Sequence, residues 1–280
     1  MASPASKKEE KSDPPPLPFF QKKKVVFRLD NDLVSVRLFK ELSEIEGAPI
    51  VVGFPNIGIT PVLACNYLVN SLDLNLIGTI APEDMASTAV VSHTGQPCHA
   101  IRIFGDKRLV VLCAELKIPD NLINGLSRAV VSFTQAMKSQ MVWCVEGVPA
   151  EEKTEKINRD KMQFLTTCEA TGKKLDGLGH EVLVDAVIAG VSGGIISEMV
   201  DCGAAGHATA LLAPASPHYP DAWPSVMIIQ LLDSLYDTWS SDTAELETKA
   251  SSLEDTVKGL MSNNLRRNYN HFWCINLFLQ

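Results

Sequence analysis

The sequence predicts an α/β protein with three layers, in which helices cover both faces of a central, mostly parallel mixed sheet, followed by a C-terminal amphipathic helix. Two observations carry this prediction. Short apolar runs alternate with segments of helical apolar spacing along most of the chain, which is typical of a parallel sheet. Several runs are continuously apolar, as in residues 50–54, which indicates strands covered on both faces.

The first half of the chain is expected to hold a buried central strand, a helix and an antiparallel excursion. Apolar residues recur at helical spacing between residues 57 and 72. Turn sequences at 94–97 and 105–106 separate three short strand candidates within residues 87–114, which favours antiparallel pairing there. Other strands are expected at 25–29, 33–38, 50–54 and 74–80.

The second half continues the alternation of helices and strands. Pro119 and Asp120 open a helix that is expected to reach about residue 139. The apolar run 183–190 is interpreted as a strand that ends in a glycine turn. Further strands are expected at 141–147, 208–214 and, more weakly, within 156–168, and further helices at 195–203 and 220–239.

Composition divides the chain into four parts. Residues 1–23 are rich in Lys, Glu, Ser and Pro and are expected to form a disordered tail. The α/β domain spans residues 24–240, and residues 241–262 form the C-terminal helix, with heptad-like apolar positions that suit packing on the domain or a dimer seam better than a long coiled coil. Residues 263–280 are unusually apolar, and three interpretations stay open: a docking peptide, a segment folded onto the domain, or an artefact of gene prediction.

Bulk charge excludes some classes of function. The net charge of −8 argues against binding to nucleic acid and to an anionic membrane surface, because both need a concentration of basic residues. No apolar run approaches the roughly 18–20 residues of a membrane-spanning helix. The start of the chain lacks the apolar stretch of a secretory signal, and the seven cysteines are scattered. A cytoplasmic, possibly nuclear, location is therefore expected.

Residues 53–58 raise the question of nucleotide binding. Gly53 and Gly58 bracket a G-x-x-x-x-G segment between a strand and a helix, which is the outline of a phosphate-binding loop. The Lys-Ser or Lys-Thr pair that contacts phosphate and Mg²⁺ is missing after Gly58, and the dinucleotide pattern G-x-G-x-x-G is absent. We interpret both glycines as structural turn residues and expect no cofactor.

Residues 190–194 match the pattern G-x-S-x-G of a nucleophile elbow. In that interpretation Ser192 would attack a substrate, with Asp201 or Asp221 as the acid and His207 or His218 as the base. The partners fit the remaining chain poorly, and no oxyanion-hole segment precedes them, so a serine hydrolase is the alternative function. The favoured interpretation makes Ser192 a helix cap and Gly190, Gly193 and Gly194 structural turn residues.

Other polar groups give weaker signals. His93, Cys98 and His99 lie close in sequence without a second ligand cluster, so no metal site is expected. Glu83 and Asp84, and separately Glu115 after an apolar run, are possible acid or base groups without an obvious partner. Trp143 is expected in the core.

Several segments, read in order, resemble the proteasome assembly chaperone family, in its archaeal-like branch and of the proteasome assembly chaperone 2 type. The resemblance covers roughly residues 45–262. Each motif is weak alone, and the ordered series is moderately specific. The matching segments are GFPNIGITPVLACNYLVNSLDLNLIGTI, PCHAIRIFGDKRLVVLCAELKIPDN, VIAGVSGGIISEMVDCGAAGHATALLAP, HYPDAWPSVMIIQLLDSL and ELETKASSLEDTVKGL.

The resemblance implies a phosphorylase/hydrolase-like α/β/α fold and a function without catalysis. Members of this family pair with themselves or with a paralogue and hold α-type proteasome subunits while the ring assembles. Some members dock through a C-terminal hydrophobic–Tyr–any tripeptide. This chain ends in Phe278-Leu279-Gln280, with Leu in the place of Tyr, which puts docking by this route in doubt.

Partner contacts are expected at loops that follow strands, because ligands of open α/β sheets bind beyond the carboxyl ends of the strands. Two loops there carry prolines and aromatic residues. The expected contact residues are Phe54, Pro55, Asn56, Tyr219, Pro220 and Asp221, together with Phe278 and Leu279 of the tail.

Overall fold

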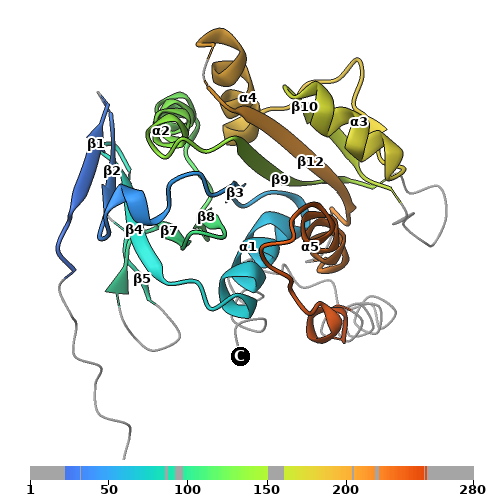
Figure 1. Cartoon of the computed structure of the whole chain (residues 1–280), viewed down its shortest axis with the longest axis horizontal. Helices are drawn as coiled ribbons and strands as arrows, with labels where there is room; N and C mark the ends of the chain where they lie inside the picture. The colour runs from blue at the N-terminus through green and yellow to red at the C-terminus, as the bar shows by residue number, and fades with distance from the viewer. Residues whose placement is uncertain are drawn as a thin grey trace, which may run out of the picture.

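The computed structural model describes residues 23–31, 33–85, 88–91, 97–150, 161–203, 205–217, 221–248 and 250. Within these residues, a ten-stranded sheet lies between two layers of helices (Figure 1). The strand order across the sheet is β1-β2-β4-β7-β8-β3-β9-β12-β10-β11. The expected three-layer α/β architecture with a mixed sheet is confirmed.

The centre of the sheet is parallel. It consists of β8 (Val110–Ala114), β3 (Ile50–Gly53), β9 (Met141–Pro149) and β12 (His207–Ala215), paired in that order. β3 and β8 are buried along their whole length, as their continuous apolar sequences predict. The carboxyl ends of these four strands therefore meet at one edge of the domain.

Both flanks of the sheet contain antiparallel pairs. On one side lie β1 (Phe27–Asp30), β2 (Val34–Leu38), β4 (Leu76–Pro82) and β7 (Ile101–Gly105). On the other side β10 (Gln163–Thr166) runs antiparallel to β12 and parallel to β11 (Glu181–Val182). The parallel share is thus four of nine pairings, which is smaller than expected. Short connections such as the turn between β7 and β8 can join only antiparallel neighbours.

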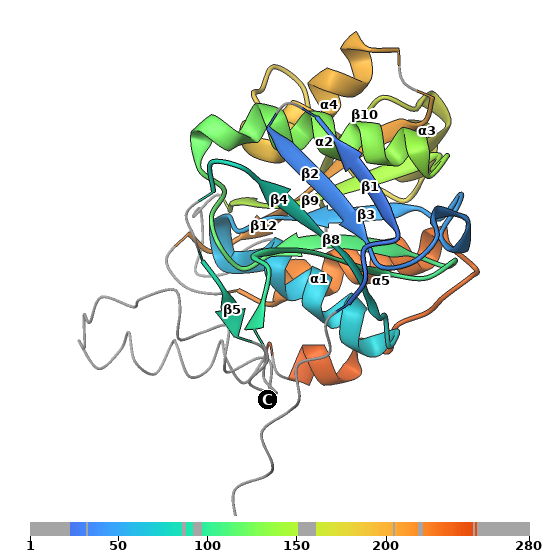
Figure 2. The ribbon, with the colours of Figure 1, turned by 90° about the vertical axis from the view of Figure 1, so that its left-hand side faces the viewer.

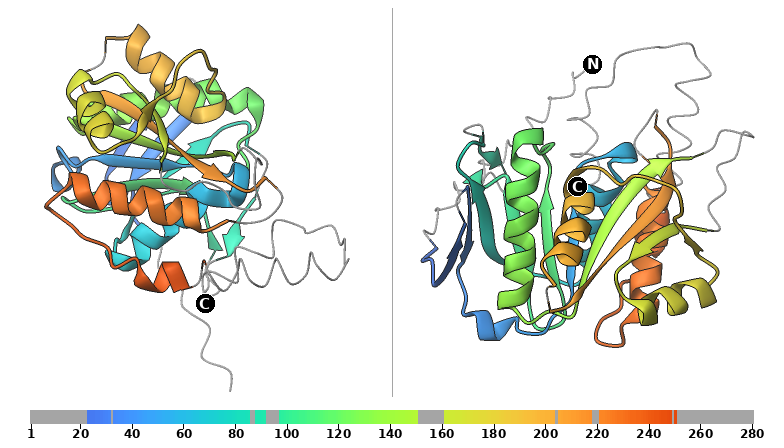
Figure 3. Two further views of the ribbon diagram at one scale, coloured as in Figure 1. Left: turned by 90° about the vertical axis from the view of Figure 1, so that its right-hand side faces the viewer. Right: turned by 90° about the horizontal axis from the view of Figure 1, so that it is seen from above.

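Helices cover the two faces unequally. α2 (Ile123–Ala136) and α4 (Gly190–Asp201) pack on one face, whereas α1 (Thr60–Ser71), α3 (Glu169–Gly177) and α5 (Trp223–Leu235) pack on the other (Figures 1 and 3). Figure 2 shows α2 above the antiparallel strands β1, β2 and β4. Each face has its own core cluster, so the sheet separates two hydrophobic cores.

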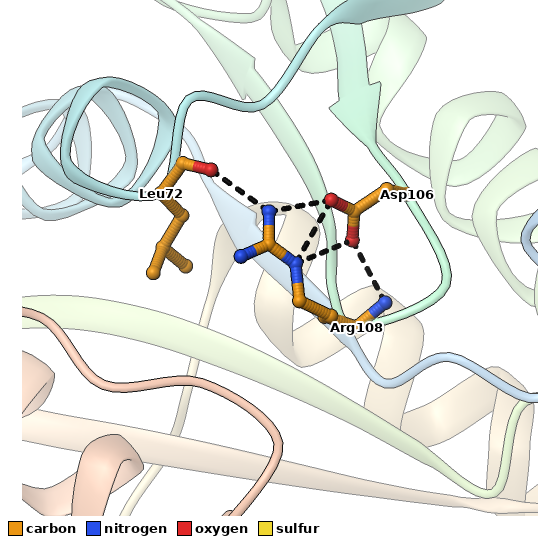
Figure 4. A network of polar contacts seen from close by, with 3 residues as sticks. All are labelled: Leu72, Asp106 and Arg108. Carbon is orange, nitrogen blue, oxygen red and sulfur yellow. Dashed lines mark hydrogen bonds and ion pairs between the residues drawn. The ribbon is translucent and has the colours of Figure 1, made fainter.

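An arginine joins the turn between β7 and β8 to the end of α1 (Figure 4). Arg108 donates from Nη2 to the carbonyl oxygen of Leu72 at 2.8 Å, and the same nitrogen lies 2.6 Å from Asp106 Oδ2. A cationic group at this position donates to a carbonyl oxygen at the C-terminus of the helix and interacts favourably with the negative end of the helix dipole. Both side chains are partly exposed, so this contact orients the hairpin more than it stabilises the domain.

One expectation for the second half is wrong, and one helix there was not predicted. Residues 183–189 form no strand, and Val184 and Val187 are 73% and 92% exposed. Their apolar run predicted a buried strand, yet it crosses the surface on the way to α4. The helix α3 was not expected, because its sequence EATGKKLDG buries only Leu175. The helices expected at 57–72 and 119–139 are confirmed as α1 and α2, each preceded by a short 3₁₀ turn, and Trp143 lies in the core.

Two short segments complete the described structure. β5 (Val90–Val91) and β6 (Pro97–Cys98) form a separate two-stranded ribbon. Residues 244–248 and 250 are helical, and Leu246 and Ala250 are each 2% exposed against the core on the α1 and α5 side. The rest of the expected C-terminal helix, the tails at 1–22 and 263–280, and His93 lie outside the described residues.

Candidate functional site

The two glycine loops singled out in the sequence meet at one carboxylate, Glu146. This residue lies near the carboxyl end of β9, two positions after the buried Cys144, on the face covered by α2 and α4. Asn56, from the loop after β3, donates its side-chain amide to Glu146 Oε2. Ser192, from the first turn of α4, donates its hydroxyl to Glu146 Oε1. A single side chain therefore connects two loops more than 130 residues apart in sequence.

The loop after β3 is fixed by contacts to its neighbours. Asn56 Oδ1 accepts a hydrogen bond from the amide of Gly147 at 3.2 Å, so the Asn56 side chain contacts both Glu146 and the backbone beside it. Gly58 adopts a φ of 67°, a region that favours glycine, and its carbonyl accepts a bond from Asp221 N at 3.1 Å. The turn thus joins the ends of β3, β9 and β12.

A close approach of two helices positions Ser192. A Cβ atom built at Gly194 would lie 2.3 Å from Ser127 Oγ of α2, so only glycine lets α4 pack this closely on α2. Ser192 is 3% exposed in the first turn of α4. Of the other glycines expected in turns, Gly53 and Gly193 also leave no room for a side chain, because a Cβ atom at either position would clash with a backbone oxygen. Gly190 instead has a φ of 79° and open space around it.

The charge of Glu146 is poorly compensated. Burial raises the pKa of Glu146 from its ordinary 4.5 to about 7, and the hydrogen bond from Ser192 opposes this rise. None of the ion pairs among the described residues includes Glu146. Its two hydrogen-bond donors are neutral. This glutamate therefore exchanges a proton near neutral pH, which is characteristic of functional carboxyl groups.

Glu146 also occupies the point where the sheet changes its direction of winding. From the end of β3 the chain continues through α1 towards β4 on one side of the sheet. From the end of β9 it continues towards β10 and α4 on the opposite side. Open α/β sheets bind their ligands beyond the strand ends at such a switch point. Position and charge together make Glu146, Asn56 and Ser192 the candidate functional site.

The structure does not assemble the hydrolase triad from the described residues. Ser192 donates to Glu146, and no histidine in the described part of the chain hydrogen-bonds to it. His207 lies at the start of β12. The residue of β12 that is paired with Glu146 is Leu212, five positions later, so His207 is about 16 Å along the strand from the level of Glu146. Asp201 ends α4 at about 13 Å from Ser192. His218, the other candidate base, lies outside the described residues.

Ser192 is also not the helix cap that the sequence suggested. α4 begins at Gly190, three residues before the start at Gly193 that the cap interpretation requires, and its N-cap residue Ala189 makes no side-chain cap bond. The Ser192 hydroxyl is turned towards β9 and hydrogen-bonds to Glu146. The cap interpretation is therefore wrong, because it placed the start of the helix after Ser192.

The expected contact residues are placed differently from one another. Phe54, Pro55 and Asn56 are half-buried at the carboxyl end of β3. Asp221 is 3% exposed, and its carboxylate accepts hydrogen bonds from the backbone amides of Ser216 and Trp223 at 3.2 Å each. Asp221 therefore helps to fix the backbone between β12 and α5 and offers little surface to a partner. Tyr219, Pro220, Phe278 and Leu279 lie outside the described residues.

Sequence reasoning missed Glu146 and noted Glu115 without its partner. Glu115 follows β8 and forms an ion pair with Arg102 of β7, with side chains 12% and 10% exposed. Arg102 also lies over the Phe104 ring, at 5.3 Å from its centre. The available signal for Glu146 was its alternation with apolar residues: Val142, Cys144 and Glu146 share one face of β9, and Val142 and Cys144 are buried in the core.

The described part of the chain contains no group of three or more His, Cys, Asp or Glu side chains arranged to hold a metal ion. Within these ranges, no helix has the length and apolar character needed to cross a membrane.

The chain was compared with known proteins. The model of the PAC2 family matches residues 50–261. No match is found among curated proteins. PbaA from Pyrococcus furiosus, described as an archaeal homolog of proteasome-assembly chaperone, is a similar solved structure at 20% identity and a TM-score of 0.72, covering 83% of this chain and 93% of PbaA.

Two further solved structures share the fold. PbaB from Pyrococcus furiosus, described as an archaeal proteasome activator, aligns at 14% identity and a TM-score of 0.70, covering 82% of this chain and all of PbaB. A PAC2 family protein from Streptomyces avermitilis aligns at 14% identity and a TM-score of 0.57, covering 76% of this chain and 95% of that protein.

Proposed function

This chain belongs to the PAC2 family, and we propose on that basis that it is a non-enzymatic chaperone of proteasome assembly. It binds α-type proteasome subunits and promotes the assembly of their ring, acting as a pair with itself or with a paralogous chain. The structural similarity to an archaeal homolog of proteasome-assembly chaperone supports this proposal.

The use of Ser192 is the observation that carries the non-catalytic part of the proposal. The serine hydrolase considered for this chain needs a histidine that accepts the serine proton and is itself oriented by an acid, and no histidine among the described residues hydrogen-bonds to Ser192. Ser192 instead donates to a carboxylate whose other oxygen is bonded to Asn56. Both glycine loops are thereby tied to each other and to β9, which suits a rigid recognition surface.

The contact surface is proposed at the carboxyl ends of the central strands. Phe54 and Pro55 are half-buried there, next to the tethered Asn56, and present apolar surface from a fixed loop. Tyr219 and Pro220, on the loop after β12, and Phe278 and Leu279 of the tail are proposed as further contacts. Apolar residues on a rigid loop lose little entropy on binding, which favours them as anchors.

The proposed compartment is the cytoplasm or the nucleus. Six cysteines in the described part of the chain are free, and Cys65, Cys113 and Cys144 among them are buried in the cores. Burial raises the pKa of the Cys65 and Cys113 thiols, which keeps them protonated and unreactive. These thiols serve as small apolar core groups, as in proteins of reducing compartments.

Direct binding to purified α-type subunits tests the proposal. Isothermal titration calorimetry is expected to show binding by the full chain and a loss of about tenfold or more for Phe54→Ala and Pro55→Ala. Val200→Ala is the matched control, because Val200 is 64% exposed at the far end of α4 and its loss is expected to change the affinity less than about twofold.

Two results would overturn the proposal. One is the absence of binding between the wild-type chain and every α-type subunit. The other is labelling by a fluorophosphonate probe that disappears in Ser192→Ala, which would show an activated serine. Melting curves of each variant separate a lost contact from a lost fold.

A further inference from the structure

Glu146 retains capacity for a ligand after its internal bonds are made. A carboxylate offers about four acceptor positions, and Asn56 and Ser192 use one on each oxygen. The residue is half-buried, so part of it remains accessible to solvent. A partly accessible anion held only by neutral donors suits a cationic group from outside.

Among the described residues, no charged side chain of the surrounding elements pairs with Glu146. On the neighbouring strand β12, Leu212 is paired with Glu146. On β3, Val52 is paired with Cys144, two residues before Glu146. The titratable residues on the covering helices are Arg128 on the exposed side of α2, and Glu198 and Asp201 in the last turns of α4. Cys144 is the titratable neighbour on β9, and burial raises its pKa so that it stays neutral. Asp221 is bonded to main-chain amides beneath the loop.

Partly buried apolar residues lie on the segments that carry the Glu146 site: the loop after β3, the end of β9 and the residues just before α4. Phe54, Val148 and Ile188 are half-buried and pack against the core cluster on the α2 and α4 side. Val148 follows Glu146 by two positions on the same face of β9. Apolar surface beside a single charge favours long cationic side chains, whose methylene stems cover apolar surface while the head group pairs with the anion.

We propose that Glu146 is the binding site for a lysine or arginine side chain of the partner subunit, which enters between the loop after β3 and the first turn of α4. This inference rests on the proposed function and specifies the chemistry of the partner's anchor. Asn56 and Ser192 hold the carboxylate in place, and the fixed loops on either side define the direction of entry.

The proposal makes binding depend on pH with a definite sign. In the free protein the pKa of Glu146 is about 7, and a bound cation lowers it, so binding releases a proton. Below about pH 7 the affinity is expected to fall by up to tenfold for each pH step of one, and above that value it levels off. Affinity therefore rises with pH through neutrality.

The experiment measures the affinity for α-type subunits between pH 5.5 and 8.5 in three variants. At pH 8, Glu146→Gln is expected to bind at least about 30-fold more weakly than wild type, with the rise through neutrality removed. Ser192→Ala keeps the carboxylate but removes a bond that lowers its pKa, so its binding curve is expected to move to higher pH. Glu198→Gln, on the last turns of the same helix, is the matched control and is expected to follow wild type.

A second measurement needs no partner. The carboxyl ¹³C shift of Glu146 is followed by NMR across the same pH range, with methylguanidinium or the neutral methylurea added. Methylguanidinium is expected to lower the pKa of Glu146 in the wild-type chain, whereas methylurea leaves it unchanged.

The outcomes separate the two proposals. If α-type subunits bind wild type and Glu146→Gln equally and with the same pH dependence, the cation site is wrong and the chaperone function stands. If no α-type subunit binds but methylguanidinium lowers the pKa, the function is wrong and the cation site stands. An unchanged pKa with methylguanidinium overturns the cation site.

Discussion

Glu115 and Glu146 lie at the carboxyl ends of two parallel strands, β8 and β9, and their charges are handled in opposite ways. Glu115 pairs with Arg102 within the domain, and both side chains are about nine-tenths covered. In the part of the chain that the structure describes, the donors to Glu146 are the neutral side chains of Asn56 and Ser192. The internal cation makes Glu115 part of the framework, whereas Glu146, which has no cation beside it among the described residues, is the carboxylate that we propose for a partner's cation. Equal residue type and similar position therefore do not imply equal function.

Removing Arg102 is expected to have the largest effect on this comparison. Arg102→Met leaves Glu115 buried without its cation, which is expected to destabilise the fold by about 3–5 kcal/mol. Urea denaturation measures the loss. The double variant Arg102→Met with Glu115→Leu is expected to recover most of it, because no buried charge remains. A loss below about 1 kcal/mol for the single variant would show that water, not Arg102, compensates Glu115.

The pH dependence of stability tests whether Glu146, unlike Glu115, is a buried carboxyl group with a raised pKa. The pKa of Glu146 is raised in the folded state, so the folded protein holds its proton between pH 4.5 and about 7 while the unfolded chain has lost it. Protonated Glu146 therefore makes its full contribution to the free energy of unfolding below pH 4.5, and this contribution is lost as the pH rises to about 7. After allowance for partial exposure, the loss is expected to be about 2–3 kcal/mol. The variant Glu146→Gln lacks this pH-dependent contribution to stability, because its amide does not titrate. The difference between wild type and variant, measured in urea at pH 5 and 8, isolates it, and an equal difference at both pH values would contradict the expectation.

Gly194→Ala tests whether the helix contact maintains the Glu146 site. The new methyl group would meet Ser127 and push α4 away from α2, which is expected to cost about 1–3 kcal/mol. The displacement moves Ser192 away from Glu146 and raises the pKa of that carboxyl group further. Thermal melts and the NMR titration of Glu146 measure both effects. Gly177→Ala in α3, at a helical glycine with open space and no positive φ, is the control for the pKa effect.

The smallest expected effect is at Thr79, beside Arg102 in the sheet register. Its buried hydroxyl has no hydrogen-bond partner among the described residues. Thr79→Val removes this unsatisfied oxygen and keeps the shape, so the change is expected to be neutral or stabilising by up to about 1 kcal/mol. Destabilisation by more than that in urea would show that the hydroxyl contributes to the framework around Arg102 and Glu115.

The sequence predicts the layers of the fold better than the surroundings of Glu146. The periodic apolar spacing of α2 and the continuous apolar run of β3 are local signals, and both elements are where expected. The run at 183–189 carries the same kind of signal, but most of its residues are exposed, and among the described residues its backbone bond to β10 ends at Leu183. Hydrophobicity alone cannot report which neighbours a segment meets.

The candidate site depended on contacts that no local pattern encodes. Asn56 and Ser192 were each noted within their glycine loops, and their common partner was not, because Glu146 at the end of an apolar strand has the appearance of a solvated terminus. Only the pairing of β9 between β3 and β12 brings the three side chains together. Register and crossover connections, which are long-range properties, therefore determine the site.

The pairing of β3 with β9 has a consequence for synthesis on the ribosome. Val52 pairs with Cys144, so the second neighbour of β3 is translated 92 residues after it. At about 5–20 residues per second this takes roughly 5–18 seconds, during which the apolar edge of β3 has no permanent neighbour on that side. A nascent chain with such an exposed strand is prone to mispairing. Until β9 follows, this edge of the new chain is therefore a site where a wrong strand can pair.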